Sequence, residues 1–222
     1  MPASPSARAE ASLPSQRILL PLPPPSWPEQ VYTALLAAAG LRRRANRLAL
    51  DHCPVSNAAH LLHAGCGNGL LTVALKHRHP ALEIEACDSS ESLLELAVER
   101  AARAKVEVLF MKGYPLGLPS TAERHDVVLT VLQLGRFDEA PRKEAFAEYR
   151  RVLRPGGSLV LVEPAGRTSG CGGRLVRRLS RCQPGLARML HSGLAEVCRA
   201  GGFSDPRILA EGPFGLQVVA AQ

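Results

Sequence analysis

The chain has 222 residues, a length that fills one α/β domain and leaves little room for a second. The formal net charge of +7 is compatible with an anionic partner, although scattered arginines more often only solvate a surface. The six cysteines form no Cys-x-x-Cys pair and no apolar run reaches the roughly 20 residues that span a bilayer, which argues against a structural zinc site, a disulfide scaffold and a membrane-spanning protein.

Prolines punctuate residues 1–27, which end in "PLPPPSWP", and we expect a flexible, Pro-rich tail there. The segment lacks the apolar core of a secretory signal, so we expect a soluble, cytoplasmic protein. Its Ser-, Ala- and Arg-rich opening leaves an organellar transit peptide as the alternative. Residues 28–54 predict two helices, 28–40 and 41–53, that form an N-terminal helical lid and end at Pro54.

Beyond residue 55 the hydrophobic pattern alternates between strand and helix. Strands are predicted at 60–64, 82–88, 106–111, 125–132 and 157–164, and helices at 69–80, 89–105 and 138–153. Helical crossovers of this length imply a parallel sheet with helices on both faces. The buried face of helix 89–105 is expected to carry Leu93, Leu94, Ala97, Val98 and Ala101.

The end of the chain has a different pattern. A helix is predicted at 193–203, and two strands follow at 206–212 and 215–222. The turn at Gly212 and Pro213 is too short to hold a crossover helix, so these strands should pair antiparallel.

Three glycines follow the first strand at every second position: Gly65, Gly67 and Gly69. In an open parallel sheet, ligands bind beyond the carboxyl ends of the strands, where this loop lies. Glycine permits positive φ there and lets backbone N–H groups approach a ligand without an intervening Cβ. A purely structural tight turn would give a similar pattern.

Asp88 ends the second strand about 20 residues after the glycines, as expected for a carboxylate that binds ribose hydroxyls. The alternative is that Asp88, Ser89 or Ser90 only caps the next helix, and the roles are compatible if Ser90 is the cap. The glycine spacing differs from the dinucleotide pattern G-x-G-x-x-G, so a ligand with one nucleoside and no diphosphate fits better. An NAD-dependent oxidoreductase is therefore disfavoured.

Several ordered segments resemble class I S-adenosylmethionine-dependent methyltransferases, and within them the branch with the quinone-biosynthesis C-methyltransferases. These are "LLHAGCGNG", "EACDSSESLLELA", "HDVVLTVL", "RRVLRPGGSLVLVEP" and "AGGF". The resemblance covers residues 55–222 as one methyltransferase domain. It implies a Rossmann-like, seven-stranded, mostly parallel sheet with helices on both faces and a C-terminal antiparallel hairpin. It also implies S-adenosyl-L-methionine as the cofactor and a small-molecule or lipid-like acceptor.

By position, the resemblance places the glycine loop under the methionine part of the cofactor and Asp88 on the ribose. Tyr114 stands where the family usually has an acid near the adenine, and His63 where it commonly has an acid near the ammonium group. A neutral imidazole supplies no negative charge there. The cofactor-binding residues that the resemblance implies are His63, Gly65, Cys66, Gly67, Gly69, Asp88, Ser89, Gly113, Tyr114 and Thr130.

No catalytic residue is assigned from the sequence. The candidates for a base are His63, the stretch 130–133 and Glu163, and for each a non-catalytic role is favoured: a motif variant, ordinary packing and a surface carboxylate. Cys66 is expected to be a small neighbour of the cofactor. The histidine spacing gives no metal site. Because His63 and Tyr114 replace acids, a methyltransferase-like binding partner or scaffold with weak or no catalysis is the second hypothesis.

The acceptor should be selected by the N-terminal helices and by residues 166–190, which follow the fifth strand. In residues 174–190 leucines alternate with arginines, which suggests peripheral contact with an anionic membrane. A mobile lid with a solvated basic face is the alternative, because Gly172, Gly173 and Pro184 are expected to interrupt the segment. No nucleic-acid partner is expected, since aromatic residues that could stack on bases are scarce.

Overall fold

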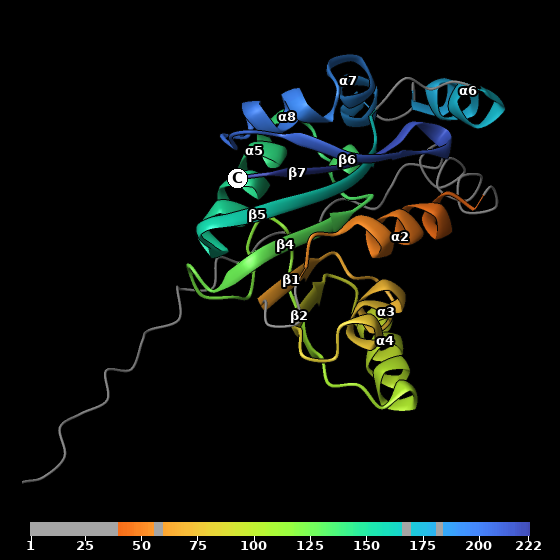
Figure 1. The fold of residues 1–222 in the computed structure, drawn as a ribbon. Helices are drawn as coiled ribbons and strands as arrows, with labels where there is room; N and C mark the ends of the chain where they lie inside the picture. The colour runs from red at the N-terminus through yellow and green to blue at the C-terminus, as the bar shows by residue number, and fades with distance from the viewer. Residues whose placement is uncertain (1–39, 56–59, 166–169, 181–183) are drawn as a thin grey trace, which may run out of the picture.

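A computed structural model describes residues 40–55, 60–165, 170–180 and 184–222. Seven strands form one sheet in the order β3-β2-β1-β4-β5-β7-β6 (Figure 1). The predicted tail 1–27 and the predicted helix 28–40, apart from its last residue, lie outside the described residues. The strands are β1 His60–Ala64, β2 Glu83–Asp88, β3 Leu109–Lys112, β4 His125–Val131, β5 Leu153–Pro164, β6 Arg207–Gly212 and β7 Leu216–Ala221.

Helices cover both faces of this sheet. Figure 1 shows α2, α3 and α4 on one side and α5, α7 and α8 on the other. No helix in the described part of the chain has the length and apolar character needed to cross a membrane. The helices are α2 Leu41–His52, α3 Leu70–Arg78, α4 Glu91–Ala104, α5 Glu139–Val152, α6 Gly170–Leu179, α7 Pro184–Ser192 and α8 Leu194–Ala200, with 3₁₀ turns η1 Leu134–Arg136 and η3 Pro213–Gly215.

The predicted topology is confirmed. Strands β1 to β5 are parallel to one another, and β7 is antiparallel to both β5 and β6. The turn at Gly212 and Pro213 continues into η3, which joins β6 to β7 without a crossover helix. The parallel sheet with helices on both faces and the closing antiparallel hairpin follow from hydrophobic periodicity and loop length, and the Rossmann-like, seven-stranded fold class is the one that the resemblance implies.

Two local predictions are wrong. Of the predicted buried face of α4, only Leu94, Ala97 and Ala101 are buried, whereas Leu93 and Val98 are 36% and 52% exposed. The part of the helix that contacts the sheet is narrower than the predicted apolar face. The expected interruption at Gly172 and Gly173 is absent, since both lie within α6.

Packing explains why α6 contains Gly172. A Cβ on this residue would lie 2.8 Å from Cδ1 of Phe214 in η3, so a side chain would separate α6 from the closing hairpin. Pro184 begins α7, as a proline in a first turn can, because its missing N–H has no partner there in any case.

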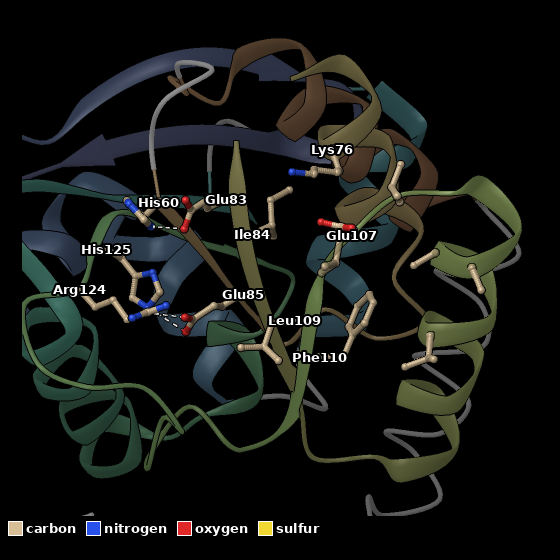
Figure 2. A pocket seen from close by; sticks show the side chains of 15 residues that line it. His60, Lys76, Glu83, Ile84, Glu85, Glu107, Leu109, Phe110, Arg124 and His125 are labelled. Atoms are coloured by element: carbon tan, nitrogen blue, oxygen red, sulfur yellow. Dashed lines mark hydrogen bonds and ion pairs between the residues drawn. The ribbon is translucent and has the colours of Figure 1, made fainter. Parts of the chain in front are cut away.

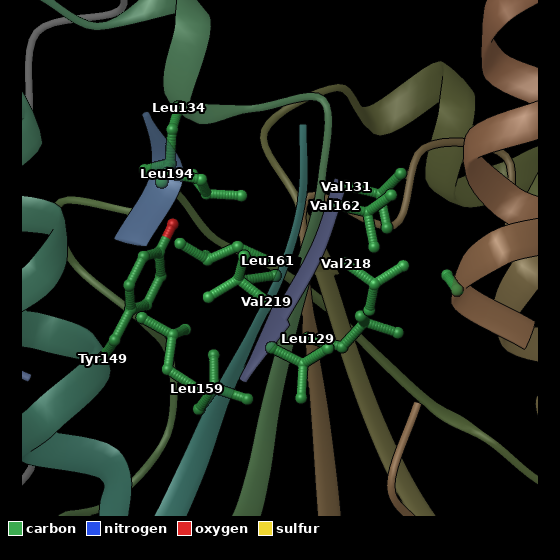
Figure 3. Packing of buried hydrophobic residues seen from close by; sticks show 14 of the residues in the cluster. Leu129, Val131, Leu134, Tyr149, Leu159, Leu161, Val162, Leu194, Val218 and Val219 are labelled. Atoms are coloured by element: carbon green, nitrogen blue, oxygen red, sulfur yellow. The ribbon is translucent and has the colours of Figure 1, made fainter. Parts of the chain in front are cut away.

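The core lies on both faces of the central strands. Alternate residues of β5 and β7 point to opposite sides (Figure 3): Leu161 and Val219 face Tyr149 of α5, while Val162 and Val218 face the side of α2. Their near-zero exposure matches the continuous apolar runs of these strands.

We predict that Leu129→Ala lowers the free energy of unfolding by about 2–5 kcal/mol, because Leu129 is fully buried in central strand β4 and truncation leaves a cavity. Chemical denaturation measures the change. Leu109→Ala on the edge strand β3 is the matched control, since Leu109 is 54% exposed and should cost roughly 0.5 kcal/mol or less. Equal losses in the two variants would contradict this placement of the core.

Candidate functional site

The strand order reverses between β1 and β4. From β1 the chain proceeds to β2 and β3 on one side, and from β4 to β5 on the other. Loops at the carboxyl ends of these two strands therefore diverge and leave a crevice, which is where open α/β sheets bind ligands. The glycine loop follows β1 and Gln133 follows β4, and the Gln133 amide nitrogen lies 3.4 Å from the carbonyl oxygen of Gly65.

Each glycine of the loop has positive φ: 79° at Gly65, 56° at Gly67 and 71° at Gly69. A Cβ on Gly65 would lie 2.5 Å from Cδ of Gln133, and one on Gly69 would lie 2.8 Å from Cβ of Ala97 in α4. Neighbouring side chains of the protein therefore explain why two of the three positions, 65 and 69, require glycine. Gly67 is different, because the nearest atom to its Cβ position is 3.4 Å away.

Asp88 links this loop to the next one. Its Oδ2 accepts a hydrogen bond of 2.8 Å from the Gly67 N–H, and its Oδ1 accepts one of 3.0 Å from the Ser90 N–H. Ser90 is the N-cap of α4, as predicted, and its hydroxyl accepts from the Leu93 N–H. Each carboxylate oxygen keeps a further acceptor site for a hydroxyl donor. Ser89, beside Asp88, is exposed at the same edge.

His63 lies within β1 and is only 2% exposed. Its Nδ1 is 2.8 Å from Oγ1 of Thr72 in α3, so the ring points into the contact between sheet and helix. Burial, helped by the charge of Arg42, lowers the pKa of His63 to about 4. The imidazole is therefore neutral near pH 7, and this position carries no charge.

Arg42 was not predicted as a site residue, yet α2 brings it to the glycine loop. The atom 3.4 Å from the Cβ position of Gly67 is Nη1 of Arg42. A second arginine, Arg100 of α4, donates to the carbonyl oxygen of Asn68 in the same loop. The sequence shows only a run of three arginines in α2, and nothing in their spacing indicates which one faces the loop.

The segment after β3 reaches the same edge. The Gly113 N–H donates a 3.0 Å hydrogen bond to the Asp88 carbonyl oxygen, and a Cβ on Gly113 would collide with Pro119. Tyr114 packs edge-on against Phe137, with ring centroids 6.0 Å apart. Its buried hydroxyl has no hydrogen-bond partner among the described residues, and burial raises its pKa.

Thr130 is fully buried in β4, on the sheet face that carries α5. Its hydroxyl neighbours that of Tyr149, yet neither makes a well-formed hydrogen bond within the described structure. Burial raises the pKa of Tyr149 far above its usual value, so the phenol stays protonated. Tyr149 was not predicted as a site residue, because its spacing in α5 is that of an ordinary core position.

Glu163 is only 2% exposed, so the prediction that it is a surface carboxylate is wrong. Its Oε1 accepts backbone N–H bonds from Gln133 and, at 2.7 Å, from Leu134, and these bonds fix the turn into η1. Burial raises its pKa to about 7, although both hydrogen bonds favour the charged form. A glutamate at the end of the apolar run "LVLVEP" is the sequence signal for such a buried acceptor.

Cys66 is buried against Ala86 and Leu94. Burial, with a smaller contribution from Asp88, raises the pKa of its thiol well above the usual range. A protonated thiol is a poor nucleophile, which agrees with a packing role for Cys66 in the loop. Among the described residues, no three His, Cys, Asp or Glu side chains are grouped as a metal site would require.

A cavity of about 610 Å³ lies elsewhere, at the amino ends of β1 to β4 (Figure 2). Its polar side chains largely pair with one another: His60 Nδ1 lies 3.0 Å from a carboxylate oxygen of Glu83, and Arg124 pairs with Glu85. The Lys76 ammonium donates to a backbone carbonyl. We therefore place the functional site at the carboxyl edge, where Asp88 keeps acceptor sites, and not in this cavity.

The sequence comparisons indicate the family. Residues 61–157 match a family described as a methyltransferase domain. The demethylmenaquinone methyltransferase of Deinococcus radiodurans is 34% identical over 138 residues, which cover 62% of this chain and 55% of that protein. A ubiquinone/menaquinone biosynthesis C-methyltransferase of Syntrophotalea carbinolica is 27% identical over 161 residues, 72% of this chain and 67% of that protein. The chain spans about half the length of the first of these curated relatives.

Solved structures share the fold. A putative O-methyltransferase from Nostoc punctiforme superposes with a TM-score of 0.67 at 20% identity, over 80% of this chain and 55% of that one. An S-adenosylmethionine-dependent methyltransferase from Aquifex aeolicus superposes with a TM-score of 0.63 at 16% identity, over 87% of this chain and 97% of that one. At these identities the likeness concerns the fold.

We predict that the stability of the protein falls with acidification partly through His63. Its pKa is about 4 when folded and 6.5 as a free side chain, so the unfolded chain binds the proton first as pH falls below 6.5. Between pH 7 and pH 5 this linkage removes about 2 kcal/mol from the free energy of unfolding. Chemical denaturation at the two pH values measures it.

His63→Asn should lose this part of the pH dependence, because asparagine does not titrate. His77→Asn is the matched control, since His77 is exposed on α3 and should leave the wild-type difference unchanged. An unaltered pH dependence in His63→Asn would show that the buried imidazole is not the titrating group.

Proposed function

Because this chain carries a methyltransferase domain of the class I S-adenosylmethionine-dependent family, we propose that it transfers the methyl group of S-adenosylmethionine to a small-molecule or lipid-like acceptor. The observation that carries the proposal is the 2.8 Å bond between Asp88 and the Gly67 N–H at the switch point of the sheet. It holds a carboxylate with open acceptor sites beside Gly67, whose Cβ position has no other atom nearer than 3.4 Å.

The residues present fit this cofactor. Asp88 can accept from two ribose hydroxyls while it keeps both backbone hydrogen bonds. In this proposal the loop 65–67, which is open at Gly67, lies under the methionine portion, and Gly113 and Tyr114 border the place of the adenine. When bound, the cofactor would supply a methyl group carried by a sulfonium. The sulfonium becomes a neutral thioether when the methyl group passes to the acceptor. The protein then has to orient the acceptor in line and exclude water, which can supply most of the acceleration.

No general base is assigned. Glu163 is buried and its Oε1 is used by the turn into η1, and the ring of His63 is turned into the contact with Thr72. The acceptor in this proposal enters beside Gln133 and η1, where α7 packs. The relatives' names suggest its class: two act on quinone precursors, and a Hahella chejuensis relative is a malonyl-[acyl-carrier protein] O-methyltransferase.

The second hypothesis is a methyltransferase-like protein that binds a partner and has weak or no catalysis. The neutral His63 and the substitution at Tyr114 support it, because both remove a negative charge that the family commonly provides to the cofactor. Under this hypothesis the fold and the Asp88 hydrogen bonds serve as a scaffold.

The chain's organisation belongs to the same proposal. We propose a tail at residues 1–27, a helical lid at 28–54 and a catalytic domain at 55–222. We also propose a cytoplasmic location, which cell fractionation tests.

Contact of residues 174–190 with an anionic membrane would be electrostatic, because Val176, Leu186 and Met189 are buried in the core. The exposed side chains on helices α6 and α7 include Arg178 and Arg188.

We predict that the wild-type protein binds S-adenosylmethionine with a micromolar dissociation constant and that Asp88→Asn weakens binding by about 10- to 100-fold. This range corresponds to the loss of one or two hydrogen bonds to a charged acceptor. Isothermal titration calorimetry measures it. Glu91→Gln is the matched control, because Glu91 is an exposed acid three residues away that pairs with Lys112.

Absence of wild-type binding at millimolar ligand would refute the methyltransferase proposal. Transfer of a labelled methyl group to quinone precursors with a short prenyl chain, or to malonyl-acyl carrier protein, separates the two hypotheses. Binding combined with transfer supports the enzyme, and binding without transfer to any acceptor tested supports the non-catalytic relative.

For the membrane contact, we predict binding to anionic but not to neutral lipid vesicles, with a strong decrease at high salt. Arg178→Glu should weaken vesicle binding by about tenfold, since each basic residue near such a surface contributes about 1 kcal/mol. Arg103→Glu, on α4, is the control. Equal binding to neutral vesicles, or equal losses in both variants, would count against this contact.

A further inference from the structure

We propose that a pocket between α5 and α8 binds a phosphate group, with the guanidinium of Arg142 as its main ligand. This site is separate from the proposed cofactor site and does not depend on it. Two observations support it. Arg142 lines a pocket of about 160 Å³, and an enclosed nitrogen of the same guanidinium, Nη1, has no hydrogen-bond partner among the described residues.

The pocket is built by the packing of α8 against α5, which lie side by side in Figure 1. A Cβ on Gly201, just after α8, would lie 2.6 Å from Cγ of Phe146 in α5, so glycine allows this close approach. A single water needs about 10–15 Å³ by the same measure of volume, so the pocket has room for a tetrahedral oxyanion. The polar lining residues are Glu139, Arg142, Lys143, Ser192 and Glu196.

The two carboxylates that line the pocket already have cationic partners. The ammonium of Lys143 lies 2.9 Å from Glu139, and the guanidinium of Arg199 lies 3.2 Å from Glu196. Arg142 forms no ion pair with a carboxylate in the part of the chain that the structure describes. The charge that remains uncompensated at the pocket is therefore positive.

A second arginine makes this charge less favourable. Burial, and next the charge of Arg188 on α7, lowers the pKa of Arg142, while Glu139 and Asp138 act in the opposite direction with smaller effects. Arg188 itself is only loosely paired, at 3.9 Å from Asp138 and 3.8 Å from Glu139. Because a guanidinium stays protonated in proteins, Arg142 cannot relieve the repulsion by losing a proton. An anion in the pocket would relieve it.

The available donors favour a phosphate group among the anions. A buried donor without an acceptor is rare in native structures, so the enclosed Nη1 of Arg142 indicates an acceptor that the chain itself does not supply. The planar fork of a guanidinium matches two oxygens of a phosphate. Lys143 has three donors, of which Glu139 uses one. A carboxylate would use both its oxygens on the arginine, whereas a phosphate keeps a further oxygen for Lys143.

The experiment measures binding of inorganic phosphate to the full chain by calorimetry and by thermal unfolding, for the wild type, Arg142→Gln, Arg142→Lys and Arg43→Gln. The wild type should bind with a millimolar or lower dissociation constant. At phosphate ten times above that constant, its unfolding midpoint should rise by roughly 3–6 °C over potassium chloride of equal ionic strength. Arg142→Gln should bind phosphate about tenfold more weakly, and Arg142→Lys should retain part of the affinity. Arg43→Gln, exposed on α2, is the matched control.

Two further readouts separate a ligand-binding role of Arg142 from a structural one. Without phosphate, Arg142→Gln should unfold at the wild-type midpoint or above it, because the substitution removes a charge that no described carboxylate pairs. A structural arginine would instead give a loss of stability that phosphate does not influence. Arg142→Gln should also bind S-adenosylmethionine as the wild type does, so failure of the phosphate site leaves the proposed function standing.

Vesicles that contain phosphatidic acid distinguish the two sources of a phosphate group. Weaker binding of Arg142→Gln than of the wild type to these vesicles identifies a lipid headgroup, and equal binding identifies the free anion. Phosphate also stabilises proteins without binding to a site, so the comparison between wild type and Arg142→Gln at the same phosphate concentration decides. An equal rise in midpoint for both proteins, or absence of wild-type binding at millimolar phosphate, overturns the proposal.

Discussion

The carboxylate of Asp88 is the interaction on which the site depends. One of its oxygens holds the Gly67 N–H at 2.8 Å and the other holds the Ser90 N–H at 3.0 Å, so a single side chain joins the loop after β1 to the start of α4. The hydrogen bonds fix the distance between the two loops before any ligand arrives. Preorganisation of this kind lowers the entropy that binding must overcome, as the proposed nucleoside site would require.

Burial then decides which charges the site presents. His63 and Glu163 are both 2% exposed, and in each case burial is the largest cause of the pKa shift, downward to about 4 for the histidine and upward to about 7 for the glutamate. One group is thereby neutral and the other is held by backbone donors in a structural role. What remains at the surface of the crevice is an anion at Asp88 and a cation at Arg42, placed on either side of Gly67.

Much of the fold could be predicted because it depends on local signals. Periodicity placed β1 and α2 within a residue of their observed ends, and the short turn at Gly212 required the antiparallel hairpin. The Ser90 cap and the position of Asp88 followed from residue type and strand ends. Arg42 could not be predicted, because its contact with the loop depends on how α2 packs across the sheet. The burial of Glu163 was missed for the same reason, since its hydrogen-bond donors lie in the turn that follows β4.

The central claim is that the glycine loop and Asp88 form one proposed binding site for an adenosylated amino acid. A crystal structure of the full chain with S-adenosylhomocysteine tests it most directly. The account predicts both ribose hydroxyls on the Asp88 carboxylate and the homocysteine chain across Gly67. A ligand bound in the hollow at the amino ends of the strands, or a ribose without contact to Asp88, would contradict it.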